Sequence, residues 1–320
     1  MNRITFIVSS FNRLDLLWDA LNSLAALMLA QESGLTFSIV FFDAGSTDGS
    51  IGAIEAFCGR FSPSSTSLII AAESEDSSFA AGLNRACAYA DTYTSPDYYL
   101  FFETDNLIEG PGPIVRAVAL LRSEPSIAAT GFTLRRRDGR RIGFGLRTPG
   151  ILGFVLGERL RTKLGVDELR VRWQDTNPEA GRYGHCDIVY TSPMLIRADA
   201  WRAVSGMDAA SFPFADCDLD LCLRLRAAGW SCAVLEVNSV IHDNLGIASQ
   251  WSATRALRFH HARFRLLRRY RGSMVQLAIP LLFLRHIAEW CLLSLRSASQ
   301  RSRRLQAQQQ LLTRVWSEYR

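Results

Sequence analysis

The feature that most constrains the fold of this chain is an alternation, along its first third, of short apolar runs with segments of helical spacing. The apolar runs have the length of strands and occupy residues 4–9, 36–42, 68–72 and 98–102. Residues 14–29, 79–90 and 111–121 place their apolar side chains on one helical face. Strands that alternate with helices form a parallel sheet covered by helices. The sequence therefore predicts an α/β fold whose first half, to about residue 105, resembles a Rossmann-like nucleotide-binding βαβ unit.

The pattern changes after residue 127. Residues 127–134 and 135–141, with a turn at Asp138-Gly139, predict an arginine-rich hairpin. Residues 143–184 are weakly periodic, which indicates a mobile functional loop or a small inserted helix pair. Further on we expect a strand at 188–196, a helix at 219–228, a strand at 232–237 and helices after 247. The chain is thus expected to divide into an α/β domain over 1–250, with halves 1–106 and 107–250, and a helical extension over 251–320.

The C-terminal extension is strongly basic. Residues 251–320 contain 14 arginines, no lysine and two glutamates, a net charge of +12, so the first 250 residues carry about −7 of the total of +5. Between 255 and 271 the arginines alternate with Leu and Phe, a pattern typical of a basic amphipathic helix on an anionic membrane surface. The alternative is a solvated helix face. Nucleic-acid binding is not expected, because no nucleic-acid module accompanies the arginines.

Two further patterns bear on location. The apolar run 274–295 contains Arg285, His286 and Glu289, so we expect it to be interfacial or packed and not to span a bilayer. The seven cysteines are odd in number, scattered and without a CxxC pair, which favours reduced, buried thiols. The N-terminal apolar stretch is too short for a signal peptide. We therefore expect a cytoplasmic protein that is peripheral on the inner face of the cytoplasmic membrane if the basic tail docks there.

An acidic turn follows the second apolar run. In FFDAGSTDGS, at 41–50, Asp43 ends the strand and a Gly/Ser/Thr/Asp turn begins. Ligands of open α/β sheets lie at the carboxyl ends of the strands, and a carboxylate there accepts the N3–H of a uracil or thymine ring. Ser10, Asn12 and Arg13, at the end of the first strand, line the same edge. The alternative is that Asp43 and Asp48 fix the turn and cap the next helix.

Acidic residues also end the fourth apolar run, in YYLFFETDN at 98–106. If the strand geometry continues to residue 105, alternation puts Glu103 and Asp105 on the same side. Two hard oxygen donors suit Mg²⁺ or Mn²⁺, which bridges to a diphosphate and neutralises it. The alternative is an acidic turn without a metal.

Two later segments carry candidate catalytic groups. Asp216, Asp218 and Asp220 enter an amphipathic helix, where one of them caps the helix or serves as a general base for an acceptor hydroxyl. His242 follows an apolar run as a metal ligand or as a half-buried histidine with satisfied hydrogen bonds.

In this order, these segments resemble the family-2 inverting glycosyltransferases of the GT-A fold, in particular the bacterial rhamnosyltransferase-like branch. FIVSSFNR at 6–13 is similar to the family's opening strand and TYNR turn, FFDAGSTDGS to its VDNGSTDGS, and FAAGLNR at 79–85 to its GFAAGNNRG. DYYLFFETD at 97–105 is similar to the strand before the metal-binding acid, and CDIVYTSPMLIR at 186–197 to the acceptor-side strand. The most specific match is DLDLCLRLRAAGW at 218–230 followed by VIHDNLG at 240–246.

The resemblance implies a role for each matching residue. On the donor side Asp43 would read the base, and the other residues that would bind the nucleotide sugar are Ser10, Asn12, Arg13, Asn84, Thr104 and Asp105. Asp105 would bind Mn²⁺ or Mg²⁺ with His242, and Glu103 is either a second ligand or an acid outside the metal's coordination shell. Asp218 would be the general base unless Asp216 takes that role, and Asp187 and Asp216 would face the acceptor.

The implied reaction moves a sugar from a UDP- or dTDP-sugar to a hydroxyl of a saccharide or lipid-linked acceptor in bacterial polysaccharide or glycolipid synthesis. The deprotonated acceptor hydroxyl would attack the anomeric carbon opposite the leaving diphosphate, so the configuration would invert.

Three other functions compete with this one. A nicotinamide-dependent dehydrogenase would need a GxGxxG turn after the first strand, where this chain has SSFNR. A nucleotide-sugar hydrolase would share the metal and donor site but would position water. A sugar-binding scaffold of degenerate glycosyltransferase fold would have lost the carboxylates, whereas Asp43, Asp105 and Asp218 are all present.

Overall fold

The computed structural model describes most of the chain. The described residues are 2–30, 34–62, 64–72, 75–143, 145–166, 173–243, 253–294, 309, 313 and 314. The helices predicted after residue 294 therefore lie almost entirely outside the described residues.

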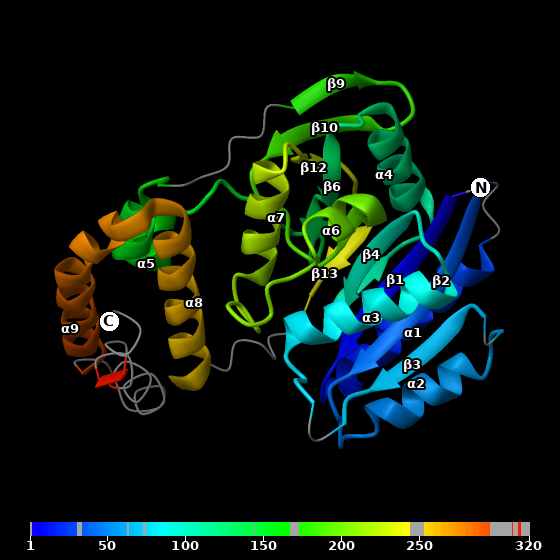
Figure 1. The fold of residues 1–320 in the computed structure, drawn as a ribbon, viewed down its shortest axis with the longest axis horizontal. Coiled ribbons are helices and arrows are strands. Elements are labelled where there is room, and N and C mark those ends of the chain that lie inside the picture. The colour runs from blue at the N-terminus through cyan, green and yellow to red at the C-terminus, as the bar shows by residue number, and fades with distance from the viewer. Residues whose placement is uncertain are drawn as a thin grey trace. The chain divides into compact units, whose positions relative to one another are not determined.

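A nine-stranded sheet of order β3-β2-β1-β4-β11-β6-β12-β10-β9 forms the body of the fold (Figure 1). Its parallel half consists of β1 (Asn2–Ser10), β2 (Leu35–Asp43), β3 (Thr66–Ile70) and β4 (Tyr98–Glu103). The helices that connect and follow these strands are α1 (Leu14–Leu29), α2 (Ser50–Cys58), α3 (Phe79–Tyr93) and α4 (Gly112–Ser123). The predicted strands and helices of this half, and the α/β class, are confirmed.

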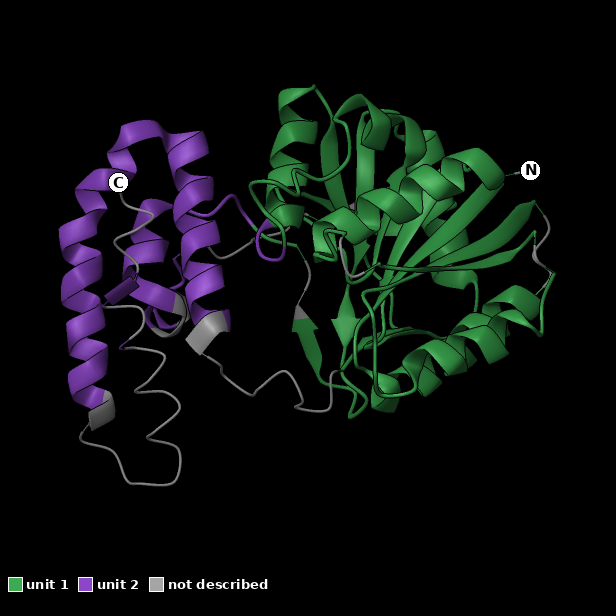
Figure 2. Ribbon diagram, turned by 60° about the horizontal axis from the view of Figure 1, so that its bottom comes forward, with its two compact units in different colours: residues 1–146, 169–213, 217–244 green, residues 147–168, 214–216, 245–320 purple. Residues whose placement is uncertain are grey.

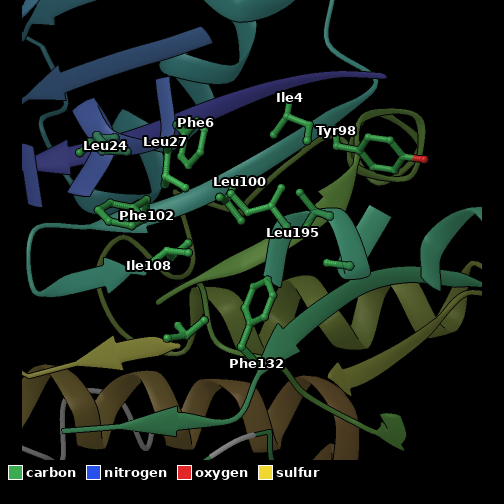
Figure 3. Packing of buried hydrophobic residues seen from close by; sticks show 14 of the residues in the cluster. Ile4, Phe6, Leu24, Leu27, Tyr98, Leu100, Phe102, Ile108, Phe132 and Leu195 are labelled. Carbon is green, nitrogen blue, oxygen red and sulfur yellow. The ribbon is translucent and has the colours of Figure 1, made fainter. Parts of the chain in front are cut away.

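The core of this half lies between β1, β4 and the inner face of α1 (Figure 3). Phe6 of β1 packs edge-on against Phe102 of β4, with ring centroids 6.3 Å apart, and both rings are buried. Leu24 and Leu27 of α1 belong to the same cluster. Burial of each such side chain stabilises the fold by about 1.5–3 kcal/mol. This packing holds the ends of β1 and β4 in fixed positions.

The second half of the large sheet adds strands of both directions. They are β6 (Ile127–Phe132), β9 (Trp173–Asn177), β10 (Gly181–Cys186), β11 (Met194–Arg197) and β12 (Ser231–Leu235), with α6 (Ala198–Ala203) and α7 (Cys217–Ala227). The strand predicted at 188–196 is wrong in its first part. Ile188 makes only an isolated bridge to Leu146, and Pro193 has no N–H to donate, so the strand begins at Met194.

A second, four-stranded sheet has the order β5-β13-β7-β8. Its strands are β5 (Asn106–Ile108), β7 (Leu134–Arg135), β8 (Arg141–Gly143) and β13 (Val240–His242). The predicted turn at Asp138-Gly139 joins the antiparallel strands β7 and β8, so a short hairpin is present. The prediction is wrong for residues 127–132, which form β6 of the large sheet and pair with β11 and β12. Gly139 of its turn has φ +82°, a conformation that glycine adopts without strain. The antiparallel pairing of β13 with β5 sets His242 opposite Asn106.

The chain forms two compact units (Figure 2). Unit 1 contains residues 1–146, 169–213 and 217–244, and unit 2 contains 147–168, 214–216 and 245–320. Within unit 2, α5 (Ile151–Lys163) packs with α8 (Ala253–Arg271), η2 (Gly272–Ala278) and α9 (Ile279–Ser294). Two helices meet within α5 at Gly157, which agrees with a helix pair in the first part of 143–184. The last part of this stretch instead forms β9 and most of β10, which neither interpretation included. The domain boundary near residue 250 stays a prediction, although contacts also assign 147–168 to the unit that holds the tail.

Candidate active site

The ends of β1 and β2 are tied together by a hydrogen-bonded turn. Oδ1 of Asp43 accepts the N–H groups of Gly45 (3.0 Å) and Ser46 (2.6 Å), and its Oδ2 accepts the Ser46 hydroxyl (2.8 Å). Asn12 donates its N–H to Oγ of Ser46 and accepts the N–H of Thr47, both at 2.8 Å. Asp43 is fully buried, so the turn-fixing role is present in the structure. Its role in reading a base stays a prediction.

Two buried polar atoms at this edge have no hydrogen-bond partner among the described residues. They are Oγ of Ser10, which pairs in register with Asp43, and Nη1 of Arg13. A buried polar atom that is left unsatisfied costs roughly 1–3 kcal/mol. A bound polar group, such as part of a nucleotide, would remove that cost.

The end of β4 lies on the other side of β1. In register, β1 sets Ser10 opposite Asp43 of β2 and Ser9 opposite Glu103 of β4. The chain adds β2 and β3 on one side of β1 and β4 on the other, so the strand order reverses here. Such a switch point is where open α/β sheets bind ligands. The fold therefore brings the Asp43 turn and the acidic end of β4 to one edge.

His242 is brought to this edge by the second sheet. Its Nδ1 lies 3.3 Å from Oδ1 of Asp105, 3.0 Å from Nδ2 of Asn106 and 3.1 Å from Oγ of Ser192. The backbone N–H of Asp243 donates to the carbonyl of Asp105. The predicted pairing of Asp105 with His242, 137 positions apart in the sequence, is thus present in the structure.

Negative charge is concentrated around Glu103. Burial, and after it the charge of Asp105, raises the pKa of Glu103 to about 7, with a further contribution from Asp218 and an opposing one from His242. Thr191 donates a hydrogen bond to Oε1 of Glu103 at 3.3 Å. Burial alone would lower the pKa of His242, but its hydrogen bond and charge interaction with Asp105 raise it above the usual value.

The donor set at this edge fits a divalent cation held by two side chains. No three His, Cys, Asp or Glu side chains in the described part of the chain come together as a metal-binding group. Asp105 and His242 are adjacent, and Glu103 adds negative charge beside them. Mg²⁺ and Mn²⁺ in nucleotide sites are bound by one or two carboxylates, with phosphates and water completing the shell. Glu103 as a third ligand stays a prediction.

The three aspartates at the start of α7 have different surroundings. Asp220 is fully buried and pairs with Arg224 at 2.7 Å. Asp216, at φ +58°, accepts two hydrogen bonds from Arg263, at 2.7 and 3.0 Å, and belongs to unit 2. Asp218 is the one whose charge acts on Glu103. The structure thus associates Asp218, and not Asp216, with the acidic end of β4.

The remaining predicted residues have structural contacts. Asn84 donates to the carbonyl of Met207 and accepts its N–H, both at 2.8 Å. Asp187 pairs with Arg226 at 3.0 Å. Thr104 is buried. The donor-side role of Asn84 and Thr104 and the acceptor-side role of Asp187 stay predictions.

Sequence reasoning missed the polar side chains that surround His242. Asn106 is fully buried, and its Nδ2 also donates to Asp105 (3.1 Å) and to Ser192 (2.8 Å). Ser192 and Thr191 lie just before β11. The sequence feature that could have identified Asn106 is its position directly after Asp105, at the acidic end of β4.

Comparison with known proteins agrees with this geometry. The model of the family described as "Glycosyltransferase like family 2" matches residues 2–272. No curated protein matches the chain. Among solved structures, mannosyltransferase PcManGT from Pyrobaculum calidifontis, in complex with GDP-Man and Mn²⁺, is similar at a TM-score of 0.54 and 16% identity, over 98% of this chain and 87% of that one.

Two further solved structures are similar at the level of the fold. S. aureus TarS 1–349 has a TM-score of 0.52 and 12% identity, over 94% of this chain and 76% of that one. GalNAc-T7 with UDP, GalNAc and Mn²⁺ has a TM-score of 0.52 and 9% identity, over 76% of this chain but only 44% of that one. The predicted GT-A-like fold is confirmed, while the rhamnosyltransferase-like branch stays a prediction.

Proposed function

The chain belongs to the glycosyltransferase-like family 2, and on that premise we propose that it is an inverting transferase that uses a UDP- or dTDP-sugar as donor. The acceptor we propose is a hydroxyl of a saccharide or lipid-linked saccharide in cell-surface polysaccharide or glycolipid synthesis. The observation that carries the proposal is the contact of Asp105 with His242, beside Glu103, at the switch point next to the Asp43 turn.

The donor would lie along the carboxyl ends of β2, β1 and β4. Neighbouring strands are about 4.8 Å apart, so the ends of β2 and β4 are separated by roughly 10 Å. That span suits a nucleoside diphosphate with its base near Asp43 and its phosphates near Asp105. The unpartnered Ser10 hydroxyl and Arg13 guanidinium nitrogen would supply donors between these two points.

We propose that Asp105 and His242 hold Mn²⁺ or Mg²⁺. When bound, the cation would neutralise the diphosphate and stabilise it as a leaving group. Asn106 and Ser192 keep the imidazole of His242 oriented toward Asp105 through their contacts with Nδ1. Glu103 would contribute its charge to the same cation once it is ionised.

We assign the general base to Asp218, with Asp216 as the alternative. A base must reach the acceptor hydroxyl with a carboxylate oxygen, take its proton and leave the oxygen to attack the anomeric carbon. Asp216 has both carboxylate oxygens bonded to Arg263, whereas the charge of Asp218 acts on the acidic end of β4. Attack from the face opposite the diphosphate would invert the anomeric configuration.

Calorimetric titration of the full chain with UDP, dTDP and GDP, each with and without Mn²⁺, tests the donor site. We expect UDP or dTDP to bind in a Mn²⁺-dependent manner and Asp105→Asn to lose the Mn²⁺-dependent part. The matched control is Asp97→Asn, which directly precedes β4 at the end of the strand away from Asp105 and accepts the N–H of Arg3. If no nucleotide binds in a metal-dependent way, the proposed donor site is wrong.

Product analysis separates transfer from hydrolysis. A transferase releases the sugar as a glycoside only when an acceptor is present, and a hydrolase releases free sugar at the same rate with or without it. The anomeric configuration of the glycoside, read by NMR, tests inversion.

A further inference from the structure

In helix α9 of unit 2, ionisable side chains face inward and apolar side chains face outward, the reverse of a helix in a water-soluble bundle. Its charged and ionisable side chains, Arg285, His286 and Glu289, are buried or half-buried. His286 is 1% exposed, whereas Leu277, just before the helix, is 78% exposed. A surface helix in water normally shows the opposite arrangement, with apolar side chains toward the core.

The inward polar groups are held by a network within unit 2. Arg285 donates to the carbonyls of Phe154 and Val155 in α5 and to Glu289 one turn later. The ring of His286 packs edge-on against His260 of α8, with centroids 4.9 Å apart. These contacts fix the rotation of α9 about its own axis. The orientation of the helix, and not the rotamer of any single side chain, therefore determines which residues form its outer face.

The outer face is continuous and apolar. Between Met274 and Leu292, a range that the structure describes in full, no exposed residue is charged and only Gln276 is polar. The large side chains of this outer face, all exposed, are Met274, Leu277, Leu281, Phe283, Leu284, Ile287, Trp290 and Leu292. A contiguous exposed apolar patch on a soluble protein marks an interaction site.

The positive charge of the segment that carries the outer face favours an anionic binding partner. The helical segment 253–294 carries eight arginines and one glutamate. Arg268, Arg269 and Arg271, at the end of α8, are exposed and directly precede the outer face. A second copy of this chain would present the same positive charge, whereas an anionic lipid surface complements it.

The ionisable residues of the segment favour an orientation in the membrane surface over one that crosses the membrane. Among the described residues, one stretch, Arg255–Leu292, is long and apolar enough by composition to cross a membrane, and 22% of its most apolar window is buried. If this stretch crossed the bilayer, it would carry Arg285, His286 and Glu289 into the apolar core, where ionisable side chains are costly. Amphipathic helices that carry basic residues on their polar side lie in the membrane surface, with the apolar face buried about 5–10 Å into the headgroup boundary.

We infer that the outer face of η2 and α9 inserts into the surface of an anionic lipid bilayer, with the exposed arginines at the end of α8 contacting lipid phosphates. This assigns membrane contact to the apolar residues 274–292, which the sequence pattern left as either interfacial or packed, in addition to the arginines near the end of α8. The inference concerns unit 2 alone and does not rest on the proposed transfer reaction.

Vesicle sedimentation of the full chain tests the inference without donor, acceptor or metal. We expect the protein to pellet with vesicles of equal parts phosphatidylcholine and phosphatidylglycerol at low salt, and to pellet less with phosphatidylcholine alone. The double variant Leu277→Glu/Leu284→Glu should bind the anionic vesicles at least about tenfold more weakly, because two leucines no longer enter the apolar layer. Leu29→Glu, which changes an equally exposed leucine of unit 1, should bind like the wild type.

Circular dichroism confirms that each variant is folded, and Arg268→Gln/Arg271→Gln provides a second test with no change to the apolar face. This variant should weaken binding and reduce its dependence on salt. The inference is overturned if the wild type stays in the supernatant with anionic vesicles at low salt, or if Leu277→Glu/Leu284→Glu pellets as the wild type does. It is also overturned if that double variant only converts a dimer to a monomer in light scattering and leaves vesicle binding intact.

Discussion

Replacement of Glu103 by glutamine should make the stability of the protein depend less on pH. Glu103 is crowded by Asp105 and Asp218 at the end of β4, and its pKa is raised from an ordinary 4.5 to about 7. Between these two pH values the folded chain retains a proton that the unfolded chain has released. Stability therefore falls as pH rises through this window, and the loss is complete above about pH 7.

The magnitude follows from the same numbers. A tenfold change in proton affinity corresponds to about 1.4 kcal/mol, so the rise in pKa destabilises the folded state by about 3 kcal/mol at pH 8. Glutamine has the same shape and no charge, so Glu103→Gln removes this term at pH 8 and changes little at pH 4.5.

Urea denaturation in the presence of EDTA, followed by circular dichroism, measures the effect. The quantity of interest is the difference in free energy of unfolding between Glu103→Gln and the wild type at pH 4.5 and at pH 8. We expect that difference to shift in favour of the variant by about 1–3 kcal/mol at the higher pH. Glu55→Gln, on the exposed side of α2, is the control and should shift by less than about 0.5 kcal/mol. A difference for Glu103→Gln that is equal at the two pH values would refute the charge-crowding argument.

Three other substitutions test the assignments around the site and in unit 2. Asp218→Asn should lower kcat by roughly 100- to 10,000-fold with nucleotide binding unchanged in calorimetry, and an equal loss of binding would contradict a base role. Gly82→Ala should cost about 1–3 kcal/mol of unfolding free energy in urea, because its Cβ would lie 2.3 Å from Cε1 of Phe42; an unchanged midpoint would contradict the close packing. Arg263→Met removes the ion-pair partner of the buried Asp216 carboxylate and should lower the free energy of unfolding in urea by about 3–5 kcal/mol. Adding Asp216→Asn should restore part of that stability, and a double variant as unstable as Arg263→Met would argue against the ion pair.

Much of the arrangement at the ends of β1, β2 and β4, the proposed donor site, could be predicted from sequence because its parts are local. A polar residue that directly follows an apolar strand must lie at the carboxyl end of that strand, and parallel strands share one such edge. This places Ser10, Asp43 and Glu103 together without knowledge of side-chain packing, and the registers of β1 with β2 and β4 confirm it.

The sequence by itself determined the parallel sheet, because apolar periodicity follows directly from which side chains must leave water. Only the tertiary structure decided what depends on pairing between distant segments. Backbone pairing of β13 with β5 brings His242 to Asp105, and the ion pair with Arg263 distinguishes Asp216 from Asp218. The orientation of α9 was also decided by tertiary structure. Helical spacing predicts an apolar and a charged face, but only the contacts of Arg285 with α5 show that the charged face is turned inward.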